Sequence, residues 1–202
     1  MSEEKAVTRH IADQKNLPAL YPTHAHPPQF WEHLGRTVAT FGFLEEVLRK
    51  ATFAFTGMRK YSDQEIMGAY EAWLPKLEKT LTDPLCNLAD SYRKAVREYP
   101  NSNIRNVDQL VDEIKKASEI RNILCHASWR PPDAEGKSLP FFANRKKEIV
   151  ETNIGVDFLG QVQAHVATLA RDVVDTVEQN GWQFPGSSGP GEIVWPGRHQ
   201  RS

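Results

Sequence analysis

Apolar residues recur at steps of three and four over most of this 202-residue chain, and this spacing limits the possible folds more than any other feature. Positions spaced in this way lie along one face of an α-helix, whereas a half-buried strand alternates apolar and polar residues. The longest stripe falls within residues 29–55 and predicts a long helix that is packed along its length and ends near Gly57. The stripe consists of Phe30, Leu34, Val38, Phe41, Leu44, Leu48 and Ala51.

Four further segments are predicted to be helical. Ser62 and Glu65 form a capping box that opens the first of them, and Pro75 either kinks or ends that helix. The segments cover residues 63–74, 84–99, 106–126 and 156–179. Their apolar residues again follow helical spacing, so we predict an all-α, up-and-down bundle of about five helices.

The length of the chain suffices for one domain with a sizeable core but not for two. Residues 29–180 contain the helical patterns and are predicted to form the bundle. Residues 1–28 are polar and contain four prolines, so we predict an extended N-terminal arm whose Leu17, Leu20 and Tyr21 could contact the bundle. Residues 181–202 are rich in Pro, Gly and Ser and are predicted to be a disordered tail.

Residues 130–155 interrupt the helical pattern directly after the fourth segment. Two short β-like runs, at residues 139–143 and 148–152, predict a small hairpin or an irregular insertion. The connection between the runs is basic, and together with Arg130 it is the local candidate for contacts to a phosphate backbone. These substrate-binding candidates are Arg130, Arg145, Lys146 and Lys147, for which a solvated turn is the alternative interpretation.

The charge balance excludes a protein that coats nucleic acid through an overall basic field. Lys and Arg number 25 against 26 Asp and Glu, which gives a net charge of −1, so any RNA contact must be local. No apolar run is long enough to span a bilayer, and the first thirty residues lack the apolar core of a signal peptide. We therefore expect a cytoplasmic protein with no membrane partner.

The two cysteines, Cys86 and Cys125, are far apart in the sequence and belong to no CxxC pair. We expect both to be reduced, buried and structural. The histidines at positions 24, 26 and 33 lack a cysteine or carboxylate at ligand spacing, so neither a metal nor another cofactor is expected.

Arg121, Asn122 and His126 lie together at the end of the fourth helical segment. Asn122 and His126 are four residues apart and share one helix face, and the long Arg121 side chain can reach the same groove. Ile123, Leu124 and Cys125 can face the core and fix the helix, which would hold the polar residues on a rigid element. Alternatively, these polar residues only satisfy the last carbonyls and the dipole of the helix.

The segment from Glu119 to Ala127 resembles the signature of the HEPN superfamily, in which an arginine, four intervening residues and a histidine end a core helix. Asn122, directly after Arg121, matches the common form of that motif. The resemblance implies a helical bundle that dimerises. It also implies a metal-independent endoribonuclease of the kind found in toxin–antitoxin, phage-defence and CRISPR-linked systems, although some members keep the fold without the chemistry.

The resemblance extends to the first helical segment, where HEPN proteins carry an acidic residue near the middle. Glu45 and Glu46 occupy this position, and a buried glutamate facing Arg121 would hold its guanidinium in a bidentate pair. For either residue an ordinary solvated helix face is the alternative.

Cleavage of RNA without a metal needs a base for the ribose 2′-hydroxyl and a cation for the charge that develops on the phosphate. His126 suits the first role, because an imidazole exchanges protons near neutral pH, and Arg121 suits the second. Asn122 would hold His126 or a phosphate oxygen. The expected products carry a 2′,3′-cyclic phosphate and a 5′-hydroxyl.

A single histidine lacks a partner acid for the leaving 5′-oxygen. The homodimer implied by the resemblance would supply it, because its composite active site contains two copies of His126 and of Arg121. In toxins that a nucleotidyltransferase antitoxin modifies, a tyrosine follows the histidine by two residues. Here that position is Ser128, which argues against this control and could instead cap the helix or contact substrate. Another antitoxin or regulatory partner remains open.

The competing class is a non-catalytic HEPN-like scaffold that binds nucleotides, RNA or other proteins. The nearly neutral net charge suits this class as well as it suits an enzyme.

Overall fold

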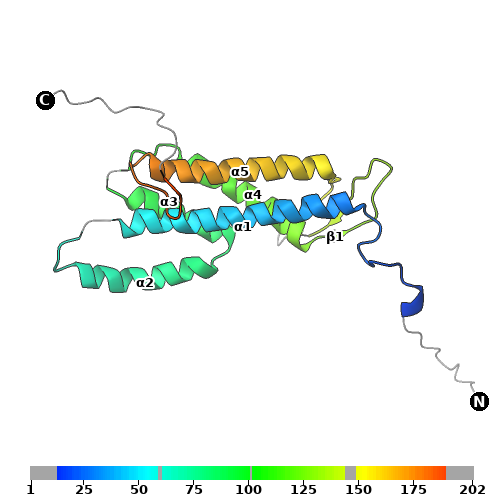
Figure 1. Ribbon diagram of the computed structural model, residues 1–202, viewed down its shortest axis with the longest axis horizontal. Coiled ribbons are helices and arrows are strands. Elements are labelled where there is room, and N and C mark those ends of the chain that lie inside the picture. Colours follow the sequence, from blue (N-terminus) through cyan, green and yellow to red (C-terminus); the bar gives the residue numbers. More distant parts are fainter. Residues whose placement is uncertain (1–12, 59–60, 101, 144–148, 190–202) are drawn as a thin grey trace, which may run out of the picture.

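The computed structural model describes residues 13–58, 61–100, 102–143 and 149–189. A short 3-10 turn, η1 (Gln14–Asn16), precedes the helices of this part of the chain. The helices are α1 (Pro28–Gly57), α2 (Ile66–Thr82), α3 (Leu85–Glu98), α4 (Val107–His126) and α5 (Val156–Glu178) (Figure 1). The prediction of an all-α bundle of about five helices is therefore confirmed.

Helix α1 is the central element of the bundle and lies alongside α5 for most of its length (Figure 1). Its predicted apolar stripe is buried except for the half-buried Val38, and Phe30, Phe41 and Leu44 are almost completely removed from solvent. Burying each such side chain contributes about 1.5–3 kcal/mol relative to leaving it exposed. Thr37 adds a polar link, because its hydroxyl donates to the Leu159 carbonyl of α5 at 3.1 Å.

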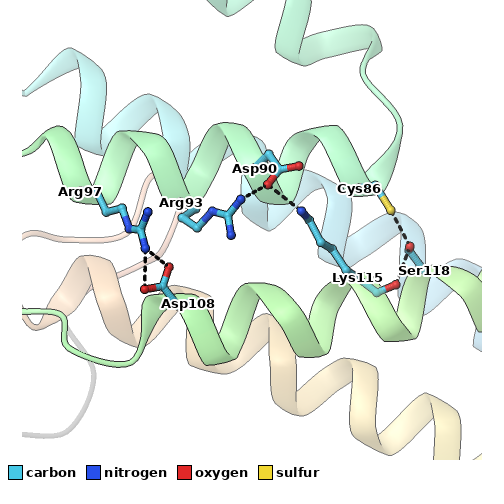
Figure 2. A network of polar contacts seen from close by, with 7 residues as sticks. All are labelled: Cys86, Asp90, Arg93, Arg97, Asp108, Lys115 and Ser118. Carbon is cyan, nitrogen blue, oxygen red and sulfur yellow. Dashed lines mark hydrogen bonds and ion pairs between the residues drawn. The ribbon is translucent and has the colours of Figure 1, made fainter.

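Helices α3 and α4 pack as an antiparallel pair, and polar contacts along their outer side show the register (Figure 2). One guanidinium nitrogen of Arg97 lies 2.6 Å from Asp108 at one end, and Lys115 Nζ lies 2.7 Å from Asp90 in the middle. At the other end, Cys86 Sγ is 2.8 Å from the Ser118 hydroxyl. Since α3 begins at Leu85, the last two turns of α4 extend beyond it.

Helix α2 lies outside the main bundle and packs more loosely than the other helices (Figure 1). Thr80 is its one buried residue. The helix continues through Pro75, and its N-terminus at Ile66 lies slightly later than predicted. Ser62 and Glu65 make only part of the predicted capping box. The Ser62 backbone N–H donates to the Glu65 carboxylate at 3.2 Å, but Glu65 is the N-cap residue and no side chain among the described residues caps the helix.

The segment after α4 forms a small irregular insertion, as predicted, but its strands pair differently. Strand β1 (Ser128–Trp129) runs antiparallel to β2 (Pro140–Phe141). One bridge, between Ala143 and Ile149, joins the two runs that were expected to form the hairpin. The Trp129 ring packs edge-on against Phe30 at 5.1 Å, which attaches the insertion to the start of α1.

Both ends of the described chain differ from the sequence prediction. Leu20 is 79% exposed, and Leu17 and Tyr21 are also exposed, so the apolar residues of the arm do not lie against the bundle. In contrast, Phe184 is only 7% exposed and Trp182 packs against Phe55. The bundle therefore continues beyond the predicted boundary at residue 180. Within the described residues, no helix is both long and apolar enough to cross a membrane.

Candidate functional site

The candidate site lies on the part of α4 that extends beyond α3. Arg121, Asn122 and Cys125 follow Ser118 by three, four and seven residues, so all of them continue the helix face that Ser118 occupies. Ser118 is buried beside Cys86, but Cys125, about two turns later, is exposed because α3 does not reach it. The expectation that both cysteines are buried is therefore wrong: Cys125 is exposed and Cys86 is only half-buried.

Apolar residues fix the end of α4 from its other side. Leu124 is buried and Ile123 packs against the core, as the sequence predicted. The helix ends at His126, because Ala127 adopts an extended conformation while its N–H still donates to the Ile123 carbonyl. Asn122 and His126 are consequently exposed side chains on a rigid helical end.

Arg121 is half-buried, and Glu45 of α1 faces it. One guanidinium nitrogen of Arg121 lies 3.7 Å from Glu45 Oε1, and Glu45 is 17% exposed. The other carboxylate oxygen of Glu45 lies 3.4 Å from Arg49, so Glu45 bridges two arginines and does not form the expected bidentate pair with Arg121. Glu46 points outward and pairs with Lys50 at 2.7 Å.

Sequence reasoning missed Arg49, which connects the candidate site to α2. Its Nε donates to the Thr80 carbonyl at 3.2 Å while its terminal nitrogen contacts Glu45. A signal was present in the sequence, because Arg49 follows Glu45 by four residues and such pairs are neighbours on a helix. The chain of contacts from Thr80 through Arg49 and Glu45 to Arg121 thus links three helices.

Asn122 contacts Arg121 and not His126, whereas its alternative role, binding a phosphate oxygen, stays a prediction. Its side-chain oxygen accepts a long hydrogen bond, 3.5 Å, from Arg121 and does not hold His126. In the described part of the chain the His126 imidazole makes no hydrogen bond. The site therefore combines a partly held cation with an exposed imidazole, which is a pair that can bind a phosphate and exchange a proton.

The structure places two of the other candidate residues next to this helix end. Ser128 is exposed in β1, where its backbone pairs with Phe141. The Arg130 guanidinium lies over the Phe141 ring at 5.4 Å, a cation–π contact that keeps it beside β1. The remaining basic candidates, Arg145, Lys146 and Lys147, fall outside the described residues.

The histidines near the start of α1 do not converge. His26 is buried between the rings of Phe30 and Trp31, and burial lowers its pKa below the ordinary value. His33 instead bonds the Gln29 carbonyl through Nδ1 at 2.9 Å. Across the described ranges, no three His, Cys, Asp or Glu side chains form a group that could hold a metal ion.

The chain matches no protein-family model, and no curated protein or solved structure matches it significantly.

Proposed function

We propose that this protein is a metal-independent endoribonuclease of the HEPN type, with Arg121, Asn122 and His126 at its active site. The observation that carries the proposal is the contact between Arg121 and Glu45. A half-buried acid on the central helix contacts the cation of the motif, on the same helical end that carries the exposed histidine. Without that acid, Arg121 would be one of many surface arginines.

The proposed reaction is an attack of the ribose 2′-oxygen on the adjacent phosphorus. His126 removes the 2′-hydroxyl proton, Arg121 stabilises the negative charge on the non-bridging oxygens, and the bond from phosphorus to the 5′-oxygen breaks. The products are a 2′,3′-cyclic phosphate and a 5′-hydroxyl. Asn122, which contacts Arg121, would bind the same phosphate. This scheme uses no metal or organic cofactor.

The leaving 5′-oxygen needs a proton, and we propose that a second copy of the chain supplies it. The face of α4 that carries Asn122 and Cys125 is a continuation of the face that α3 buries, but it is uncovered. A homodimer that covers this face would place two copies of His126 at one composite site, one as base and one as acid.

Arg130 lies beside this helix end and is proposed to contact the RNA backbone, together with Arg145, Lys146 and Lys147 of the same insertion.

An enzyme of this kind would act on cytoplasmic RNA in a toxin–antitoxin or phage-defence system. It would then need an antitoxin or another regulatory partner. Since Ser128 replaces the modifiable tyrosine, that partner would act by another route.

A second candidate is a HEPN-like scaffold that binds RNA, nucleotides or proteins without cleaving them. This candidate is favoured because the His126 imidazole makes no hydrogen bond that would orient it within the described residues. Incubation of the purified protein with mixed RNA in the presence of EDTA separates the two candidates. Fragments with cyclic phosphate ends support the nuclease, and retention of intact RNA supports the scaffold.

A further inference from the structure

A cleft separate from the candidate site lies between α2 and the helices α1 and α3, on another side of α1 from the α5 contact. Its volume is about 530 Å³, which is in the range of small-molecule sites. Aromatic and small side chains form much of its wall, and lysines and acids lie among them. The wall includes Thr52 and Thr56 of α1, Tyr61, Ala69 and Trp73, and Ala95 of α3.

The cleft exists because α2 does not fill the space beside α1. Trp73 does not enter it fully: its Nε1 donates to the Thr56 hydroxyl at 2.9 Å and its ring packs on Phe53 at 5.6 Å. Thr52 also lines the cleft, is only 8% exposed, and its hydroxyl oxygen has no hydrogen-bond partner among the described residues. A buried hydroxyl without a hydrogen-bond partner is destabilising, so the fold leaves a polar group in the wall that a ligand could bind.

The charges around the cleft favour an anionic occupant. Two of its acids are already paired, Asp90 with Arg93 and Lys115, and Glu98 with Lys94. The third acid, Asp83, accepts a hydrogen bond from the uncharged Asn87 amide and keeps its negative charge, which offsets one positive charge of the cleft. Lys76 and Lys79 of α2 also line the cleft, and neither makes an ion pair within the described ranges.

We propose that this cleft binds a small organic anion that combines an aromatic body with one acidic group. The aromatic body would lie against Trp73 and Tyr61, and the acidic group would lie between Lys76 and Lys79. The loose packing of α2 allows the small shift that brings a polar atom of the ligand to the Thr52 hydroxyl. Binding at this site does not depend on RNA cleavage, so its test is independent of the proposed nuclease activity.

The test uses a matched pair of fluorescent probes on the full chain. The probe 1-anilinonaphthalene-8-sulfonate has the proposed chemistry, and N-phenyl-1-naphthylamine has the same rings without the acidic group. We expect saturable binding of the sulfonate at one site, with weaker binding of the neutral amine. The absence of saturable binding, or equal affinity for both probes, would overturn the proposal.

Variants then locate the binding site. The double variant Lys76→Gln/Lys79→Gln should raise the Kd of the sulfonate about fivefold or more, because two nearby charges are lost. The double variant Lys15→Gln/Lys116→Gln changes the same number of exposed lysines away from the cleft and should leave the Kd unchanged. Equal effects of the two double variants would contradict the assignment.

Thr52→Val provides an independent check that does not depend on charge. Removing an unpaired buried hydroxyl should leave the melting temperature unchanged or raise it, while the affinity for the sulfonate falls. An unchanged affinity in the folded variant would show that Thr52 takes no part in binding and would overturn its role in the site.

Discussion

Glu45 holds Arg121 through a single contact of 3.7 Å, and its other carboxylate oxygen faces Arg49 at 3.4 Å. Because the Glu45 carboxylate is shared, part of the Arg121 guanidinium is left available for an anionic ligand. Glu45 would thus act as a positioning residue, which orients the cation without touching the substrate.

Replacing Glu45 should impair catalysis more than binding. In Glu45→Gln the charge that orients Arg121 is lost, and we expect kcat for RNA cleavage to fall roughly tenfold because a misplaced catalytic group is costly. Glu46→Gln is a matched control, since Glu46 is adjacent, exposed and paired with Lys50. An equal fall of kcat in both variants, or a change in KM alone, would argue against positioning.

Arg49 should stabilise the attachment of α2 to the bundle. Arg49→Met removes the bond to the Thr80 carbonyl and should cost about 0.5–1.5 kcal/mol of local stability. Hydrogen exchange of the α2 amides should accelerate, whereas Arg36→Met, which removes an exposed pair with Glu32, should leave it unchanged. Unaltered exchange in α2 of Arg49→Met would show that this contact does not hold the helix.

The exposed thiol of Cys125 should report the proposed dimer. If two motif helices face each other, a short bismaleimide should link the Cys125 residues of two chains into a covalent dimer. Cys86→Ala should still form this dimer and Cys125→Ala should not, because Cys86 is half-buried beside Ser118. Covalent dimers that persist without Cys125 would contradict the proposed interface.

The stability of the fold should decrease in mild acid because of His26. Burial lowers its pKa from an ordinary value of 6.5, so the folded state binds this proton less readily than the unfolded state. The free energy of unfolding is therefore unaffected by His26 above about pH 6.5. It decreases as the pH falls below that value, because the unfolded state then takes up the proton more readily than the folded state. His26→Phe, which preserves the ring packing, should show a smaller decrease in melting temperature between pH 7.5 and 5.5. An identical decrease in both proteins would rule His26 out as the cause.

The features that were predicted most accurately from the sequence are those that depend on a single helix. The buried stripe of α1 follows from the spacing of its apolar residues, and the end of α4 near His126 follows from Pro131 and Pro132, which cannot continue a helix. The exposure of Cys125 could not be predicted, because it depends on where α3 begins relative to α4. The burial of Phe184 likewise depends on the chain returning to the bundle after α5. It was not predicted, because the Pro- and Gly-rich composition of this segment is typical of a disordered tail.

The pairing of Glu45 with Arg121 lies between these cases. Both glutamates are candidates from the resemblance, and Glu45 is the one predicted to support the site. The packing of α1 against α4 places Glu45 beside Arg121, whereas Glu46 pairs with Lys50. The substrate-binding role of the insertion stays a prediction, as only Arg130 of its four basic candidates falls within the described residues.

The most direct test of the central claim is RNA cleavage by the wild type and by His126→Ala in the presence of EDTA. The ends of the fragments are identified by mass spectrometry. Circular dichroism and light scattering confirm that the fold and the oligomeric state are the same in both proteins. We expect the wild type to produce 2′,3′-cyclic phosphate ends and the variant to produce none. Cleavage at the wild-type rate by the folded variant, or none by either protein, would contradict the assignment of His126.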